Sequence, residues 1–206
     1  MRRLFPFSMS LANRITIIRI LCVPVFILVF VYYLLSAERA GKTPDGVMHA
    51  NEFLYWAAMM IFVGAALSDA VDGYFARSRR EVTRLGTVLD PLADKALLLS
   101  AVILLGRPSA LLFRPHLPIW FVLLVVSRDV VLLLGAMLVQ HMTGDVKVRP
   151  RVSGKITTFL QMLLVVWVFA GLGSPLYCWL LGAATFFTAF SGVQYVIDGI
   201  EQIEKV

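Results

Sequence analysis

The chain has 206 residues, of which 59% are hydrophobic and 16% are charged, and its formal net charge is +6. Soluble domains are about 45–50% apolar, so this composition excludes an ordinary soluble domain. It indicates an all-α integral membrane protein that folds as one domain over residues 1–206. The positive charges lie in short loops between apolar runs, not in a basic segment interleaved with aromatic residues. They therefore indicate membrane topology and not nucleic-acid binding.

Six apolar runs are long enough to cross a bilayer, which takes about 20 residues each. They lie approximately at residues 15–36, 53–76, 87–105, 118–140, 155–171 and 175–197. Ahead of the first run, residues 5–14 (FPFSMSLANR) fit either a short amphipathic helix in the membrane interface or a disordered tail. We expect six transmembrane helices preceded by the short interfacial helix.

The cysteines and histidines show no metal or disulfide pattern. Cys22 and Cys178 both fall inside apolar runs and are interpreted as small buried hydrophobic residues, not as disulfide partners. The three histidines are scattered near the ends of runs, with no spacing typical of zinc sites.

Arginine and lysine are concentrated in alternate connections. The loops after the second and fourth runs are rich in them, as is the N-terminus, whereas the first and third connections carry two each. The positive-inside rule then places both termini and the two rich loops in the cytoplasm. The end of the second run and the start of the third should therefore lie at the cytoplasmic face.

Four aspartates interrupt those two runs: Asp69, Asp72, Asp90 and Asp94. An aspartate at the centre of a membrane helix costs roughly 2.5–3.5 kcal/mol. The spacings of three and four residues put each pair on one helix face, and a short loop makes the two helices antiparallel neighbours whose acidic faces can meet. Converging carboxylates need a counter-charge. Divalent ions such as Mg²⁺ supply it, and a pair of them can clamp a phosphoryl-type displacement.

The residues between the aspartates suit a phosphate-bearing substrate. Gly73 leaves room for a ligand beside Asp72, Ala76 keeps the next turn narrow, and Arg77 can pair with phosphate oxygens. Gly86 opens the third helix, whose N-terminus favours anions. Two simpler interpretations remain, namely solvated or arginine-paired carboxylates and a proton or cation path. Four aspartates at helical spacing on two adjacent helices, with glycines at the approach points, disfavour the first, and the second does not explain the glycines or Arg77.

This stretch resembles the signature of the CDP-alcohol phosphatidyltransferases. The matching pattern is Asp69-x2-Asp72-Gly73-x2-Ala76-Arg77-x8-Gly86-x3-Asp90-x3-Asp94. The resemblance continues in NRITIIRILCVP (residues 13–24), SRDVVLLLGA (residues 127–136) and SGKITTFLQM (residues 153–162), which are similar to the phosphatidylglycerophosphate synthase and cardiolipin synthase branches. It covers most of the chain.

The resemblance implies a six-helix membrane enzyme of phospholipid biosynthesis, usually a homodimer, with a polar cavity open to the cytoplasm. Such enzymes displace CMP from CDP-diacylglycerol with an acceptor hydroxyl. Asp69, Asp72 and Asp90 would bind two Mg²⁺ or Mn²⁺ ions, and Asp94 would complete that site and act as the base. By motif position, the CDP pocket would be shaped by Gly73, Ala76, Arg77 and Gly86. We expect a bacterial inner membrane protein with its active site facing the cytoplasm.

The acceptor site is expected around two cations that open predicted helices, Arg128 and Lys155. In the phosphatidylglycerophosphate synthase branch, the matching arginine and lysine serve the phosphate of glycerol 3-phosphate, and Asp129 is expected to pair with Arg128. Arg149 and Arg151 join the same cationic cluster, although topology or contact with anionic headgroups also explains them.

Other functions remain open. Pro150 and the RDV at Arg128 resemble the cardiolipin synthase branch, so phosphatidylglycerol is the alternative acceptor. A non-catalytic lipid-binding module would have no physical reason to keep four costly aspartates. A small cation transporter would place its acids mid-bilayer on several helices.

Overall fold

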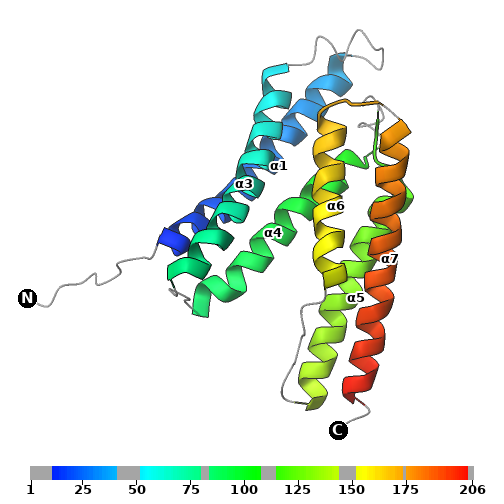
Figure 1. Ribbon diagram of the computed structural model, residues 1–206. Coiled ribbons are helices and arrows are strands. Elements are labelled where there is room, and N and C mark those ends of the chain that lie inside the picture. Colours follow the sequence, from blue (N-terminus) through cyan, green and yellow to red (C-terminus); the bar gives the residue numbers. More distant parts are fainter. Residues whose placement is uncertain are drawn as a thin grey trace, which may run out of the picture. The chain divides into compact units, whose positions relative to one another are not determined.

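Six helices make up the described part of the computed structural model (Figure 1). The backbone is described for residues 11–40, 52–79, 84–107, 115–143, 152–173 and 175–203, and the side chains for residues 18–39, 52–68, 95–107, 115–139, 141, 152–173 and 175–202. The helices are α1 (Leu11–Ala40), α3 (Glu52–Arg79), α4 (Arg84–Leu105), α5 (Ile119–Thr143), α6 (Val152–Phe169) and α7 (Pro175–Ile203). Each coincides closely with one predicted run, which confirms the all-α fold. Most of the predicted interfacial segment, residues 5–10, lies outside the described residues, and its last four residues belong to α1.

Cα proximity divides the chain into two compact units, residues 1–101 and 102–206. The first unit contains α1, α3 and most of α4, and the second contains α5, α6 and α7. The expectation that the whole chain is one domain stays a prediction.

Four of the helices are long and apolar enough to cross a membrane: residues Ile18–Arg39 of α1, Ile119–Val139 of α5, Val152–Phe169 of α6 and Pro175–Gln202 of α7. The apolar parts of the other two that the structure describes are shorter, Glu52–Ser68 in α3 and Lys95–Leu105 in α4. Large apolar side chains are exposed on these helices, including Trp179, which is 79% exposed. Exposed apolar surface on this scale is unusual for a soluble monomer but expected against lipid tails.

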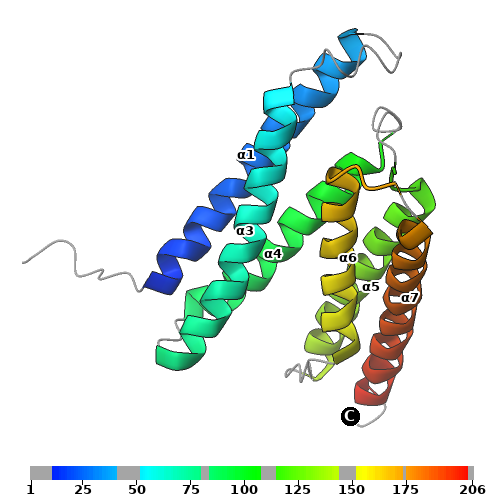
Figure 2. The ribbon, with the colours of Figure 1, turned by 45° about the horizontal axis from the view of Figure 1, so that its top comes forward.

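The first unit is held together by aromatic side chains between α1 and α3, which lie side by side in Figures 1 and 2. On α1, Phe26 stacks on Phe30 with ring centroids 5.8 Å apart, and Phe30 stacks on Tyr33 at 6.0 Å. Across the interface, Phe26 meets Phe62 at 5.9 Å and Tyr33 meets Tyr55 at 5.3 Å. Aromatic pairs at these distances add roughly 0.5–1.5 kcal/mol each beyond the area they bury.

In the second unit, α7 packs against both α5 and α6. The turn that brings α7 back beside α6 has a defined backbone. Gly171 has a φ of +64°, its N–H donates to the Val168 carbonyl, and the Leu172 N–H reaches the Trp167 carbonyl. These two bonds and the left-handed glycine make a Schellman ending. Pro175 then opens α7, a position where its missing N–H costs nothing.

The connection from α4 to α5 also depends on a glycine. The Cβ that any other residue would carry at position 106 would collide with a side-chain methyl of Val122 on α5. The chain can therefore turn closely past α5 only because Gly106 has no side chain.

The expectation that both cysteines are buried is wrong. Both are free, but Cys178 is exposed and Cys22 is only half-buried, so they are not the buried residues that their apolar surroundings suggested. In a membrane protein an apolar run does not distinguish the faces that touch lipid from those that touch protein, since both are apolar.

Candidate functional site

The predicted metal ligands lie where the sequence places them along the backbone. Asp69 and Asp72 are near the end of α3, Asp90 and Asp94 are in the first half of α4, and residues 80–83 connect the two helices. Their side chains lie outside those the structure describes. The same is true of Gly73, Ala76, Arg77 and Gly86, and Arg149 and Arg151 fall in the segment 144–151, which is also outside. Among the described side chains, no group of three or more metal-ligating residues occurs.

The segment NRITIIRILCVP (residues 13–24) lies within α1. Arg19 is buried, with 3% of its surface exposed, and Pro24 is accommodated inside the helix. A buried arginine in a largely apolar membrane helix is energetically costly. Membrane insertion alone therefore does not explain why α1 carries Arg19.

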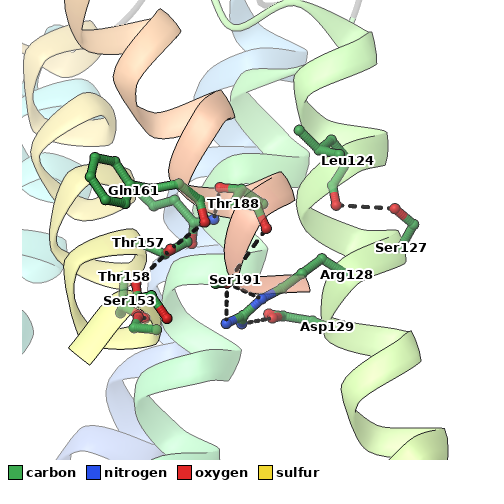
Figure 3. Close-up of polar contacts among 12 residues, drawn as sticks. Leu124, Ser127, Arg128, Asp129, Ser153, Thr157, Thr158, Gln161, Thr188 and Ser191 are labelled. Atoms are coloured by element: carbon green, nitrogen blue, oxygen red, sulfur yellow. Dashed lines mark hydrogen bonds and ion pairs between the residues drawn. The ribbon is translucent and has the colours of Figure 1, made fainter. Parts of the chain in front are cut away.

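Arg128 was expected to open a helix, but it lies inside α5, because the apolar residues from Ile119 onward already belong to that helix. It is the centre of the polar cluster that the structure does describe (Figure 3). Only 7% of its surface is exposed. Its Nε donates to the Ser191 Oγ on α7 at 3.2 Å, and its Nη2 donates to the same oxygen at 2.9 Å. Its Nη1 forms an ion pair with the Asp129 carboxylate at 2.7 Å, which confirms the predicted pairing of these two residues. The guanidinium carbon lies 5.6 Å from the centre of the Tyr195 ring.

These contacts explain how a charge is held inside an apolar bundle. A buried ion is costly unless it is paired and its remaining donors are satisfied. Asp129 supplies the opposite charge, Ser191 supplies an acceptor, and the Tyr195 ring supplies a cation–π contact, which is strongest where water is excluded. The result is a rigid, positively charged planar fork, the geometry that matches carboxylate and phosphate groups.

Two glycines make room for this cluster. A Cβ at Gly192 would lie 3.3 Å from the Arg128 Cγ, and a Cβ at Gly154 would lie 2.9 Å from the Tyr195 hydroxyl oxygen and 3.6 Å from the Arg128 Nη2. Gly154 therefore lets the first turn of α6 approach the guanidinium closely. Lys155 follows it in the sequence, and its side chain is exposed. The structure thus brings Arg128 next to the backbone that carries Lys155.

A line of buried and partly buried polar contacts continues from this cluster along the α6–α7 interface (Figure 3). The Ser153 hydroxyl donates to the Gln194 Oε1 at 2.6 Å. The Thr157 hydroxyl lies 2.9 Å from the Phe187 carbonyl on α7, and the Gln161 Nε2 donates to the Thr188 Oγ1 at 3.0 Å. Hydrogen bonds of this kind hold membrane helices together where hydrophobic burial provides no preference.

Sequence reasoning missed Ser191 and Tyr195. A signal was nevertheless present in α7, because Thr188, Ser191 and Tyr195 are three and four residues apart and therefore share one face of an otherwise apolar helix. Polar residues repeated at helical spacing in a membrane span indicate an interface with protein and not with lipid.

The similarity to known proteins covers most of the chain and not only the Arg128 cluster. A model of the CDP-alcohol phosphatidyltransferase family matches residues 9–191, a range that includes parts of both units. The chain is 33% identical over 201 residues to the CDP-diacylglycerol–glycerol-3-phosphate 3-phosphatidyltransferase of Bacillus subtilis (strain 168), covering 95% of this chain and 97% of that protein.

Two further relatives carry different names. A probable phosphatidylglycerophosphate synthase of Mycobacterium tuberculosis is 30% identical over 198 residues, covering 94% of this chain and 83% of that protein. A cardiolipin synthase (CMP-forming) of Streptomyces coelicolor is 28% identical over 210 residues, covering 92% of this chain and 82% of that protein. Similarity over more than nine-tenths of this chain therefore extends to relatives named for phosphatidylglycerophosphate synthesis and to one named for cardiolipin synthesis.

Proposed function

The chain belongs to the CDP-alcohol phosphatidyltransferase family, and from that premise we propose that it transfers the phosphatidyl group of CDP-diacylglycerol to glycerol 3-phosphate. The products are phosphatidylglycerophosphate and CMP, which makes the protein an enzyme of phospholipid biosynthesis. The observation that carries this proposal is the similarity to the Bacillus subtilis enzyme, which extends over 95% of this chain.

The Arg128 cluster supports a phosphate-bearing acceptor. The phosphate of glycerol 3-phosphate carries about 1.5 to 2 negative charges near neutral pH, as phosphomonoesters do. A buried guanidinium that is already held by Ser191 and Asp129 offers such a group a fixed donor fork. Lys155 adds a second positive charge on the first turn of α6. We assign both cations to binding of the acceptor phosphate, with Arg149 and Arg151 contributing positive charge.

The four aspartates are assigned to the metal site. Carboxylate oxygens are the ligands that Mg²⁺ and Mn²⁺ prefer, so Asp69, Asp72, Asp90 and Asp94 would hold two such ions. Within α3 and within α4, the spacing of each pair places both carboxyl groups on one helix face. When bound, the ions would neutralise charge on the diphosphate and on the departing CMP.

The chemical step needs one proton acceptor. The acceptor hydroxyl oxygen forms a bond to the phosphatidyl phosphorus, the phosphorus–oxygen bond to CMP breaks, and the hydroxyl proton leaves. We assign that proton to Asp94 as the general base. Arg77 would hold the diphosphate of the donor, and the small residues Gly73, Ala76 and Gly86 would leave room for CDP.

We further propose six membrane spans, both termini and the site residues at the cytoplasmic face of a bacterial inner membrane, and a homodimer. The alternation of arginine- and lysine-rich connections supports this orientation. The homodimer rests on resemblance to the family. Mass measurement of the protein in lipid nanodiscs tests it directly.

Cardiolipin synthesis is the second candidate. The Streptomyces coelicolor relative named for it covers 92% of this chain at 28% identity, and Pro150 stands five residues before Lys155, as in that branch. Phosphatidylglycerol carries a diester phosphate with one charge, so it depends less on a second cation at the acceptor site.

An acceptor comparison tests the proposal. Purified protein in mixed micelles with CDP-diacylglycerol and Mg²⁺ would receive glycerol 3-phosphate, phosphatidylglycerol, inositol phosphate or serine in turn, and CMP release would be followed. An Asp90→Asn variant prepared in parallel is the inactive control. CMP release with glycerol 3-phosphate, and with none of the other three acceptors, supports the proposal. Release with phosphatidylglycerol instead assigns the chain to cardiolipin synthesis, and release with none of the acceptors indicates a non-catalytic lipid-binding module.

A further inference from the structure

We infer that Ser191 is a positioning residue, which holds one edge of the Arg128 guanidinium so that the other edge faces the acceptor phosphate. This rests on the proposed function, because the assignment of the acceptor phosphate to Arg128 belongs to it. Ser191 is not itself expected to touch the acceptor. Its role would be to fix the direction in which Arg128 donates.

The hydrogen bonds of Arg128 show which N–H groups of the guanidinium are already bonded and which are left for the acceptor phosphate. A guanidinium has five N–H groups, one on Nε and two on each terminal nitrogen. The Ser191 Oγ accepts from Nε and from Nη2, and the Asp129 carboxylate accepts from Nη1. Within the described residues, these bonds employ three of the five N–H groups and leave one on each terminal nitrogen. A pair of N–H groups on the two terminal nitrogens is the fork that binds two oxygens of one phosphate.

The orientation of Ser191 suits it to this task. Its side chain is fully buried, with 0% of its surface exposed, so water does not compete for its oxygen. Its own hydroxyl points toward the Thr188 carbonyl at 3.5 Å, one turn earlier on α7. The lone pairs of the oxygen are therefore directed at the arginine, and a single atom accepts from both N–H groups of that edge.

The surroundings restrict the other movements of the guanidinium. The Tyr195 ring lies 5.6 Å from the guanidinium carbon. The backbone at Gly192 packs against the arginine stem, where an added Cβ would lie 3.3 Å from Cγ. With the stem and one face restrained in this way, rotation about the bond that carries the guanidinium is the main freedom left. The Ser191 hydroxyl restrains that rotation at Nε and Nη2, and the Asp129 carboxylate restrains it at Nη1.

Three variants test the inference. Ser191→Ala removes the acceptor, Ser191→Thr keeps a hydroxyl, and Thr188→Val removes a different buried hydroxyl from the same helix without removing a bond to Arg128. Binding of glycerol 3-phosphate would be measured by calorimetry in nanodiscs without donor, and KM and kcat would be measured with both substrates. We expect Ser191→Ala to weaken acceptor binding and raise the acceptor KM about tenfold, while kcat and the donor KM change less than about twofold. Ser191→Thr should restore most of the loss, and Thr188→Val should leave acceptor binding as in the wild type.

A double-mutant cycle separates positioning from a general structural role. If Ser191 acts through Arg128, then Ser191→Ala should have no further effect on acceptor binding once Arg128→Ala is present. Should Ser191→Ala fail to fold, Ser191→Cys replaces the oxygen with a weak acceptor of similar shape and takes its place in the cycle.

The outcomes distinguish this inference from the proposed function. Wild-type acceptor affinity in the Ser191 variants, or an equal loss with and without Arg128, overturns the positioning role even when glycerol 3-phosphate is a good substrate. Absence of CMP release overturns the proposed function, whereas a Ser191-dependent affinity for glycerol 3-phosphate would still support the positioning role.

Discussion

The side-chain amide of Gln161 on α6 donates a hydrogen bond of 3.0 Å to the hydroxyl oxygen of Thr188 on α7, and both side chains are buried. Gln161→Leu keeps the volume but loses this bond between the helices. Such bonds average about 0.6 kcal/mol in a membrane protein, with a maximum of about 1.7 kcal/mol. We therefore expect a small but measurable loss of stability in SDS unfolding. Thr158→Val is the matched control, because the Thr158 hydroxyl bonds only the Gly154 carbonyl of its own helix in the described structure. Equal loss in both variants would show that the bond between the helices has no special weight.

A second stability prediction concerns Gly106. Gly106→Ala should destabilise the protein by about 1–3 kcal/mol, as overpacking does, because the new Cβ would collide with Val122. Adding Val122→Ala should recover much of that loss. Gly135→Ala, at a helical position with nothing within 4 Å of the new Cβ, serves as control and should be neutral or slightly stabilising. Thermal unfolding of the wild type and these three variants measures this, and failure of the double variant to recover would mean that the strain lies elsewhere.

Activity should depend on a divalent ion. Because four carboxylates are assigned to one site, chelation should abolish CMP release, and Mg²⁺ or Mn²⁺ should restore it. The measurement is the initial rate of CMP release with and without excess EDTA. Ca²⁺, which prefers more ligands and longer bonds, is a useful comparison. Full activity in the presence of excess chelator contradicts the assignment of the aspartates.

Asp94 should differ from the other aspartates. Asp69→Asn should weaken metal and donor binding together, since that side chain is assigned to the metal alone. Asp94→Asn should affect donor binding less and lower mainly kcat, because a base acts in the chemical step. Steady-state kinetics with varied donor and varied metal separate the two. Wild-type kcat in Asp94→Asn would require a different base.

The acceptor site should respond to loss of either cation. A charge-assisted hydrogen bond is worth roughly 1.5–3 kcal/mol, so Arg128→Ala or Lys155→Ala should raise the KM for glycerol 3-phosphate about tenfold to a hundredfold. The KM for CDP-diacylglycerol should change much less. Arg107→Ala, which removes an exposed arginine just after α4, is the control for loss of a positive charge. Unchanged glycerol 3-phosphate kinetics in both variants would refute the assignment of this pocket.

The helices could be predicted because a membrane span needs a long apolar run, and each run became a helix. Their ends were less accurate. The last predicted run ends at residue 197, whereas α7 continues to Ile203 through Asp198 and Glu201. Hydropathy detects where the apolar part ends, but a helix satisfies its own backbone hydrogen bonds and continues into polar sequence.

Only some contacts of the Arg128 cluster could be predicted from the sequence. The pairing of Arg128 with Asp129 follows from adjacent opposite charges and is confirmed. The bond to Ser191 joins residues 63 positions apart and depends on how α5 and α7 pack. Composition cannot report that packing, because the lipid-facing and protein-facing sides of these helices are both apolar. The roles of the four aspartates stay predictions, since they rest on spacing and resemblance.

The order of α5, α6 and α7 along the chain has a consequence for biogenesis. Arg128 and Gln161 are synthesised on α5 and α6, but Ser191 and Thr188, which accept their hydrogen bonds, are synthesised later, on α7. Until α7 is inserted, these polar groups are in a membrane without those acceptors, a costly state. A chain interrupted before α7 should therefore be recognised by membrane quality control as unassembled, and insertion of α7 becomes the event that completes the polar contacts of this unit.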